Sequence, residues 1–141
     1  MIAIAFLLSA ALFAIALLHA WWGLGGRWPA SDEAKLARTV VGDGRTRMPP
    51  PWQCYAVAAL LTMVALWPWL ILALPSDNVV VAVGYVITGV FILRALAVAS
   101  PRWRTHFPAE PFATYDRRLY GPLCFTIGIC FAALLAEGGK A

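Results

Sequence analysis

The stretch IAIAFLLSAALFAIALLHAWW, residues 2–22, decides the fold because it is almost entirely apolar and contains no Asp, Glu, Lys or Arg. A helix needs about 20 apolar residues to cross the ~30 Å hydrocarbon core of a bilayer. The run is longer than the roughly 7–15 apolar residues of a signal peptide, and no basic segment precedes it. We therefore expect a retained transmembrane helix.

Three further apolar stretches follow, at residues 52–74, 79–99 and 118–136. The composition agrees with a membrane location, since 62% of the residues are hydrophobic and 13% are charged. Soluble domains have about 45–50% apolar and about 25% charged residues. Because unpaired backbone groups are costly in lipid, each stretch should be a helix. The sequence predicts an all-α fold, a single membrane domain over residues 1–141 built as a bundle of four transmembrane helices.

The connections between these stretches differ in length. Residues 75–78 form a tight turn, so the second and third helices should be antiparallel neighbours. Residues 23–51 and 100–117 are long and are predicted to be loops, and the first of them ends in the proline run 49–51. Prolines favour extended backbone in the residue that precedes them, so no helix should continue through this run.

Basic side chains gather in the two long connections and are absent from the short turn. The members are Arg27, Lys35, Arg38, Arg45 and Arg47 in the first connection, and Arg102, Arg104 and Arg117 in the last. Connections rich in Lys and Arg stay in the cytoplasm, so we expect both termini outside. This orientation accounts for the net charge of +4. We expect no nucleic-acid partner, because no basic helix face or aromatic platform lies outside the apolar segments.

Folding the helices antiparallel brings several polar residues to one depth, near the predicted cytoplasmic side. His19 precedes the end of the first helix, Arg94 precedes the end of the third, and Asp116 lies where the fourth begins. The residues that we predict to bind a ligand at this depth are His19, Trp22, Arg94, Asp116, Arg118 and Tyr120.

Arg94 is the most costly member of this polar layer. Even insertion scales give an arginine at a helix centre a cost of about 2.5–3.5 kcal/mol. Two arrangements would lower that cost. The guanidinium could extend to the cytoplasmic interface along its own aliphatic chain, or it could pair with Asp116 beside His19. The paired arrangement would fix helix packing or surround an anionic ligand group.

The candidate catalytic residues of the layer are His19, Asp116 and Tyr120. A histidine titrates near neutral pH and can carry a proton, but acid–base catalysis requires such groups within about 3 Å of one another or of the substrate. We expect no cofactor and no metal. His106 and Glu110 are four residues apart, but Pro108 between them breaks helical geometry and no further ligand-spaced His or Cys joins them.

Two passages at this depth resemble one protein family. Residues 19–29, HAWWGLGGRWP, resemble its opening pattern H-x-x-W-x-x-G-x-x-W-P, and residues 112–124, FATYDRRLYGPLC, resemble its closing pattern F-A-x-x-D-x-R-L-Y-x-P-L-C. Arg94 stands where the family tends to place an arginine. The chain is thus similar, over nearly its whole length, to the small bacterial membrane proteins of the DUF3995 family. The resemblance implies four helices in the bacterial inner membrane and no particular activity.

Three functions fit these observations. The first is a non-enzymatic membrane protein that binds a lipid or small amphiphile in a polar site near the cytoplasmic face, as helix-bounded pockets commonly do. The second is a membrane-embedded enzyme that acts on a lipid-soluble substrate through His19 and Asp116. The third is a small transporter or channel subunit, which requires a homo-oligomer because four helices are few for a pathway. Membrane lipids are expected partners in each case, since basic loops attract anionic headgroups by about 1 kcal/mol per residue.

Overall fold

The computed structural model describes residues 1–138, and this part of the chain is helical with no strand. In chain order the elements are α1 (Ile2–Gly23), α2 (Glu33–Val40), α3 (Pro51–Ala73), α4 (Asn78–Ala97), α5 (Pro101–His106), α6 (Phe112–Tyr115), the π-helix η1 (Asp116–Tyr120) and α7 (Gly121–Gly138). The predicted all-α fold is confirmed for the described residues.

Four helical segments are long and apolar enough to cross a membrane, which indicates a multi-pass membrane protein. The first three are α1, α3 and α4, and their ends agree with the predicted stretches to within about two residues. The fourth spans Phe112–Gly138 and begins earlier than the predicted residue 118. Its first turns, α6 and η1, contain polar residues that an apolar run does not include, so the sequence pattern placed its start too late.

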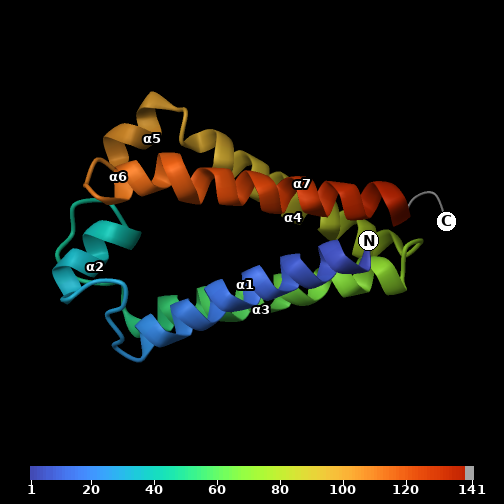
Figure 1. Ribbon diagram of the computed structural model, residues 1–141, viewed down its shortest axis with the longest axis horizontal. Coiled ribbons are helices and arrows are strands. Elements are labelled where there is room, and N and C mark those ends of the chain that lie inside the picture. Colours follow the sequence, from blue (N-terminus) through green and yellow to red (C-terminus); the bar gives the residue numbers. More distant parts are fainter. Residues whose placement is uncertain (139–141) are drawn as a thin grey trace.

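The four long helices form two antiparallel pairs, α1 with α3 and α4 with α7 (Figure 1). The short turn after Leu74 makes α3 and α4 neighbours as predicted, and Trp67 Nε1 donates a hydrogen bond to the carbonyl of Val80 at 3.0 Å. Asp77 caps α4, since its carboxylate accepts hydrogen bonds from the backbone N–H groups of Val79 and Val80. Even so, α3 packs far more extensively against α1 than against α4. Each of these helices is apolar on every side, so the pattern alone did not select these partners.

The hydrophobic core lies at the end of the bundle that holds the start of α1, the end of α7 and the α3–α4 turn. Its members are Ala5, Leu8, Leu12, Ala65, Ile71, Val80, Ile87, Ile127, Phe131, Leu134 and Leu135. They come from the first half of α1 and α4, from the second half of α3, and from residues 127–135 of α7. In Figure 1 the two pairs are close together at this end and diverge toward the end that holds α2. The pairs therefore share a packed core over only part of their length.

The two long connections lie at the diverging end, and each contains a helix that was expected to be a loop (Figure 1). α2 begins at a capping residue, Asp32, whose Oδ1 accepts the backbone N–H of Lys35 at 2.8 Å. Its Leu36 and Ala37 are buried, at 1% and 0% exposure. Eight residues are too few to hold a helix in water unaided, so tertiary packing stabilises α2. This packing is what the loop prediction could not include.

Candidate functional site

Arg94, Trp103 and Asp116 form a hydrogen-bonded group, which we call the Arg94 cluster. Arg94 Nη2 donates to Oδ1 of Asp116 at 2.5 Å, and Trp103 Nε1 donates to Oδ2 at 2.8 Å. The guanidinium carbon lies 4.6 Å from the centre of the Trp103 ring, which adds a cation–π attraction. Asp116 is only 2% exposed. Of the two arrangements that the sequence left open for Arg94, the structure contains the pair with Asp116.

The π-helix η1 positions Asp116 in this cluster. The backbone N–H of Gly121 bonds to the carbonyl of Asp116, which widens the turn by one residue. Such turns occur often at functional sites. Here the widened turn directs Asp116 toward α4 and α5, while Tyr120 at its end reaches α2. Gly121 fits because an added Cβ would lie 2.9 Å from the Asp116 carbonyl oxygen and 3.0 Å from the Val98 side chain.

One donor of the Arg94 guanidinium has no partner. Within residues 1–138, its Nη1 is the buried side-chain nitrogen or oxygen that lacks a hydrogen bond. Leaving a buried donor unpaired costs about 1–3 kcal/mol, and more for a charged group.

A cavity of about 310 Å³ lies between the two helix pairs at their diverging end, and Arg94 is in its wall. We call it the inter-pair cavity. It is lined by His19, Trp22, Val40, Val41, Met48, Pro49, Gln53, Cys54, Val57, Arg94, Trp103, Phe107 and Phe112. Small-molecule sites in proteins are mostly apolar cavities of about 300–1,000 Å³ with a few polar groups. The inter-pair cavity matches that description at the lower end of the size range.

His19 supplies a second polar group to the cavity. Its Nδ1 lies 2.9 Å from the carbonyl oxygen of Ile15, one turn earlier on α1. A carbonyl can only accept, so Nδ1 carries the hydrogen and Nε2 of the neutral ring keeps a free lone pair. The ring packs edge-on against Trp22, with 4.9 Å between ring centroids. The Trp22 indole itself donates to the carbonyl of Trp28 at 2.8 Å, which fixes the wall beside His19.

The structure brings together three of the six residues that we predicted to bind a ligand. His19, Trp22 and Arg94 all line the inter-pair cavity. Asp116 lies behind Arg94 and is not part of the cavity wall. Arg118 is exposed and is also outside this wall.

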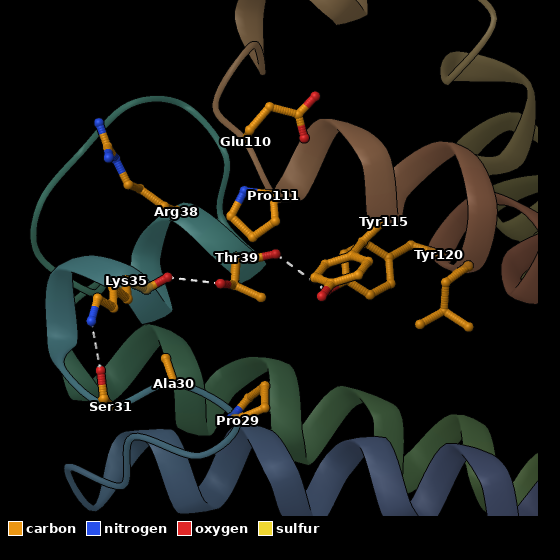
Figure 2. A pocket seen from close by; sticks show the side chains of 11 residues that line it. Pro29, Ala30, Ser31, Lys35, Arg38, Thr39, Glu110, Pro111, Tyr115 and Tyr120 are labelled. Atoms are coloured by element: carbon orange, nitrogen blue, oxygen red, sulfur yellow. Dashed lines mark hydrogen bonds between the residues drawn. The ribbon is translucent and has the colours of Figure 1, made fainter.

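Tyr120 lies in a second, larger cavity of about 680 Å³ between α2 and the start of the fourth span. Figure 2 shows its hydroxyl group directed toward Thr39, to whose carbonyl it donates a hydrogen bond at 3.2 Å. Phe112 lines the first cavity and packs against Tyr120, with 5.7 Å between ring centroids. The Phe112 and Tyr120 rings therefore separate the two cavities.

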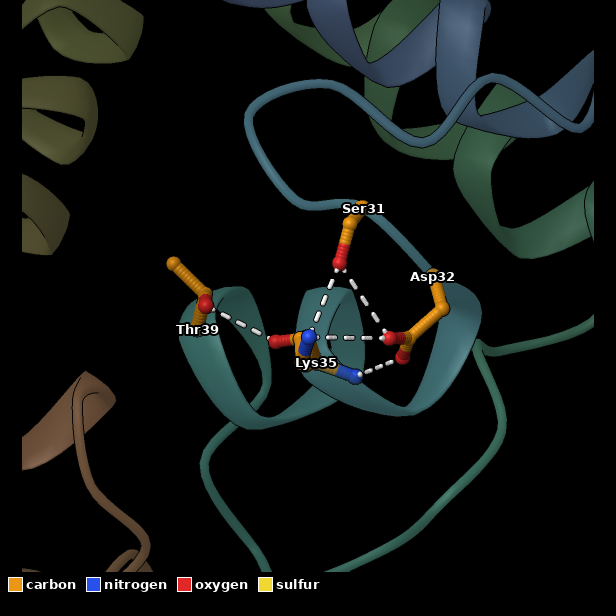
Figure 3. A network of polar contacts seen from close by, with 4 residues as sticks. All are labelled: Ser31, Asp32, Lys35 and Thr39. Carbon is orange, nitrogen blue, oxygen red and sulfur yellow. Dashed lines mark hydrogen bonds and ion pairs between the residues drawn. The ribbon is translucent and has the colours of Figure 1, made fainter.

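Surface contacts around the cap of α2 shape one side of this second cavity. Figure 3 shows Lys35 Nζ between Ser31 Oγ, at 3.0 Å, and Asp32 Oδ2, at 3.4 Å. The hydrogen bond from the Lys35 backbone N–H lowers the pKa of the exposed Asp32 carboxyl below its ordinary value. These exposed contacts fix the start of α2, and Lys35 is not part of the wall of the inter-pair cavity.

Several residues of the site were not predicted from the sequence. Trp103, Phe107 and Phe112 line the cavity, and Trp103 also bonds to Asp116. An aromatic-rich connection was visible in the sequence, but its residues carried no periodic pattern that could place them against Arg94. Within residues 1–138, no three His, Cys, Asp or Glu side chains are grouped so as to hold a metal ion.

A family model described as "Protein of unknown function (DUF3995)" matches residues 12–131. The chain belongs to the DUF3995 family. Neither the curated proteins nor the solved structures gave a match. The matched range of this DUF3995 protein includes His19, Arg94 and Asp116, so the site lies within the part of the chain that defines the family.

The contacts limit what this DUF3995 site can do chemically. Both carboxylate oxygens of Asp116 already accept hydrogen bonds, and the group is buried beside a cation. These contacts suit a residue that positions Arg94, and they do not suit a general base. The polar side chains that line the inter-pair cavity are instead those of Arg94, His19 and Gln53, which are suited to holding a polar head.

Proposed function

We propose that this DUF3995 protein binds a lipid or small amphiphile in the inter-pair cavity, near the cytoplasmic face of the bacterial inner membrane. The single observation that carries the proposal is that the polar side chains of Arg94 and His19 line a largely apolar cavity. A ligand with a polar head and an apolar body would pair with these side chains and fill space that the helix pairs do not fill.

The location of the core supports binding rather than passage through the chain. Leu12, Phe131 and Leu134 are fully buried where the pairs meet, at 0% exposure each. A tightly packed end of this kind closes the bundle above the cavity. A single copy therefore has a blind pocket, which suits a binding protein better than a channel.

The proposed orientation rests on the basic residues at the cavity end of the bundle. The helices α2 and α5 lie at this end, and both connections that contain them are rich in Lys and Arg. Exposed tryptophans, which favour the membrane interface, occur at both ends, as Trp28 and Trp52 at one and Trp69 at the other. Fusions of a reporter enzyme and a fluorescent protein to each terminus test the orientation. A terminus that reports a cytoplasmic location would overturn it.

Native mass spectrometry of the purified protein tests the binding proposal, with a cavity-filling variant as the comparison. Val57 lines the cavity, and Val57→Trp should fill part of it. Val90→Trp is the matched control, because Val90 is 59% exposed on α4 and is absent from the cavity wall. We expect the wild type and Val90→Trp to retain a non-protein molecule that Val57→Trp loses. Equal retention by all three proteins, or retention by none, would contradict the proposal.

A further inference from the structure

The hydrogen-bonding groups of the inter-pair cavity are complementary to a particular kind of ligand head. Arg94 offers donors, since it lines the cavity with a guanidinium of five N–H groups, and its bond from Nη2 to Asp116 uses only one of them. His19 offers an acceptor, since Nδ1 donates to the Ile15 carbonyl and the neutral ring keeps a lone pair on Nε2. A head that satisfies both must accept one hydrogen bond and donate another. A hydroxyl group can do both.

The charges around the cavity favour a neutral head. Among its lining residues, Arg94 is the charged side chain, and Asp116 compensates that charge from behind. An anionic head would therefore carry a negative charge that no further cation in the wall balances. Burying an unbalanced charge is strongly unfavourable, whereas a neutral polar head needs only hydrogen-bond partners. A carboxylate or phosphate ester is thus a poor match for this cavity.

The walls and the size favour a flat ring. Four aromatic side chains, Trp22, Trp103, Phe107 and Phe112, are among the lining residues. Aromatic rings pack favourably in stacked or edge-on contacts with one another. At about 310 Å³, the cavity is at the small end of ligand sites, which suits a single ring with the start of a tail.

We infer that the cavity binds a neutral hydroxylated aromatic amphiphile, that is, a phenol, resorcinol or hydroquinone ring with an alkyl tail. The ring lies among the aromatic walls, a hydroxyl oxygen accepts from the Arg94 guanidinium, and a hydroxyl hydrogen is donated to His19 Nε2. The inference rests on the proposed function, because it names the ligand class of that same cavity.

Equilibrium binding of three probes with the same tail tests this assignment on the full chain in detergent micelles. Decylresorcinol has the ring and the hydroxyl groups, decylbenzene lacks the hydroxyl groups, and decanoate carries a charge instead of a ring. We expect decylresorcinol to bind at least about tenfold more tightly than either of the others, since two hydrogen bonds of ordinary strength give more than a factor of ten. Equal or tighter binding of decylbenzene or decanoate would overturn the assignment.

A histidine variant tests the acceptor directly. His19→Phe keeps the ring shape and removes Nε2, so decylresorcinol should bind about 5- to 10-fold more weakly while decylbenzene binding is unchanged. His106→Phe is the matched control, because His106 makes the same bond to a carbonyl four residues earlier, at 3.0 Å, but is exposed outside the cavity. Should His19→Phe fail to fold, His19→Gln restores an acceptor and should retain more affinity than His19→Ala. Identical affinities in all His19 variants would overturn the role of Nε2.

The two proposals fail in different ways. Decanoate binding that Val57→Trp abolishes would refute the ligand class and support the cavity as a binding site. Binding of no probe, with a molecule retained in native mass spectrometry, would also refute only the ligand class. Binding of no probe, with no molecule retained, would refute both.

Discussion

Replacing Asp116 with Asn should destabilise the protein strongly, because Asp116 holds two donors in a buried position. The side chain of Asp116 is 3% exposed and that of Arg94 is 28% exposed. Removing one partner of a buried ion pair costs about 3–5 kcal/mol. The guanidinium is partly exposed and can recover some solvation, so the lower part of this range applies. The asparagine keeps one oxygen, but its amide hydrogens would face a donor, either Arg94 Nη2 or Trp103 Nε1. We expect a loss of about 3 kcal/mol in the free energy of unfolding.

Reversible unfolding in mixed detergent micelles measures this change, with Arg117→Gln as the control. Arg117 is one residue away and pairs with Glu110 at 3.7 Å, but these side chains are 50% and 59% exposed. Exposed pairs contribute about 0–1 kcal/mol, so the control should change little. The double variant Arg94→Met with Asp116→Leu removes both charges and should be less destabilised than the sum of the single variants. An Asp116→Asn protein as stable as the control would refute the structural role of the cluster.

Two further predictions concern glycine packing and pH. Gly121→Ala should lower the free energy of unfolding by about 1–3 kcal/mol, because its Cβ would meet a backbone oxygen at 2.9 Å and the Val98 side chain at 3.0 Å. At Gly89 an added Cβ has open space, so Gly89→Ala should instead stabilise α4 by up to about 1 kcal/mol in the same unfolding assay. The folded-state pKa of Asp32 is lowered, so its contribution to α2 is present above the ordinary pKa of about 3.9 and is lost as the pH falls through the folded pKa. Hydrogen exchange at the Leu36 amide, corrected for intrinsic exchange, should lose protection below about pH 4, and Asp32→Ala should abolish this pH dependence. A protection profile that Asp32→Ala leaves unchanged would contradict the assignment of the cap.

The long apolar helices could be predicted from the sequence because bilayer thickness imposes a minimum length on each run. The pairing of these helices could not, since α1 and α4 are apolar on every side and present no polar face that would orient them. The helix α2 left a weak sign in Ser31, Asp32 and Glu33, which are residues typical of a helix start. The burial of α2 depends on contacts with α6, a helix that lies far away in the sequence.

The candidate site was predicted to the same partial extent. Antiparallel folding places His19, Arg94 and Asp116 at one depth, and the structure contains the Arg94–Asp116 pair that was one of two alternatives. Depth says nothing about direction around a helix axis, so the exclusion of Tyr120 from the inter-pair cavity was not foreseen. The π-turn at residues 116–120 sets those directions, and no residue pattern specifies its backbone hydrogen bonding.

Photo-crosslinking from inside the cavity tests the central claim most directly. A benzophenone amino acid at position 57 would lie in the wall of the inter-pair cavity, and one at position 90 would lie on the exposed side of α4. After irradiation of membranes, mass spectrometry identifies the molecules attached at each position. The proposed function predicts adducts at position 57 that are enriched in one ligand class over the bulk lipids captured at position 90. Adducts of the same bulk composition at both positions would contradict it.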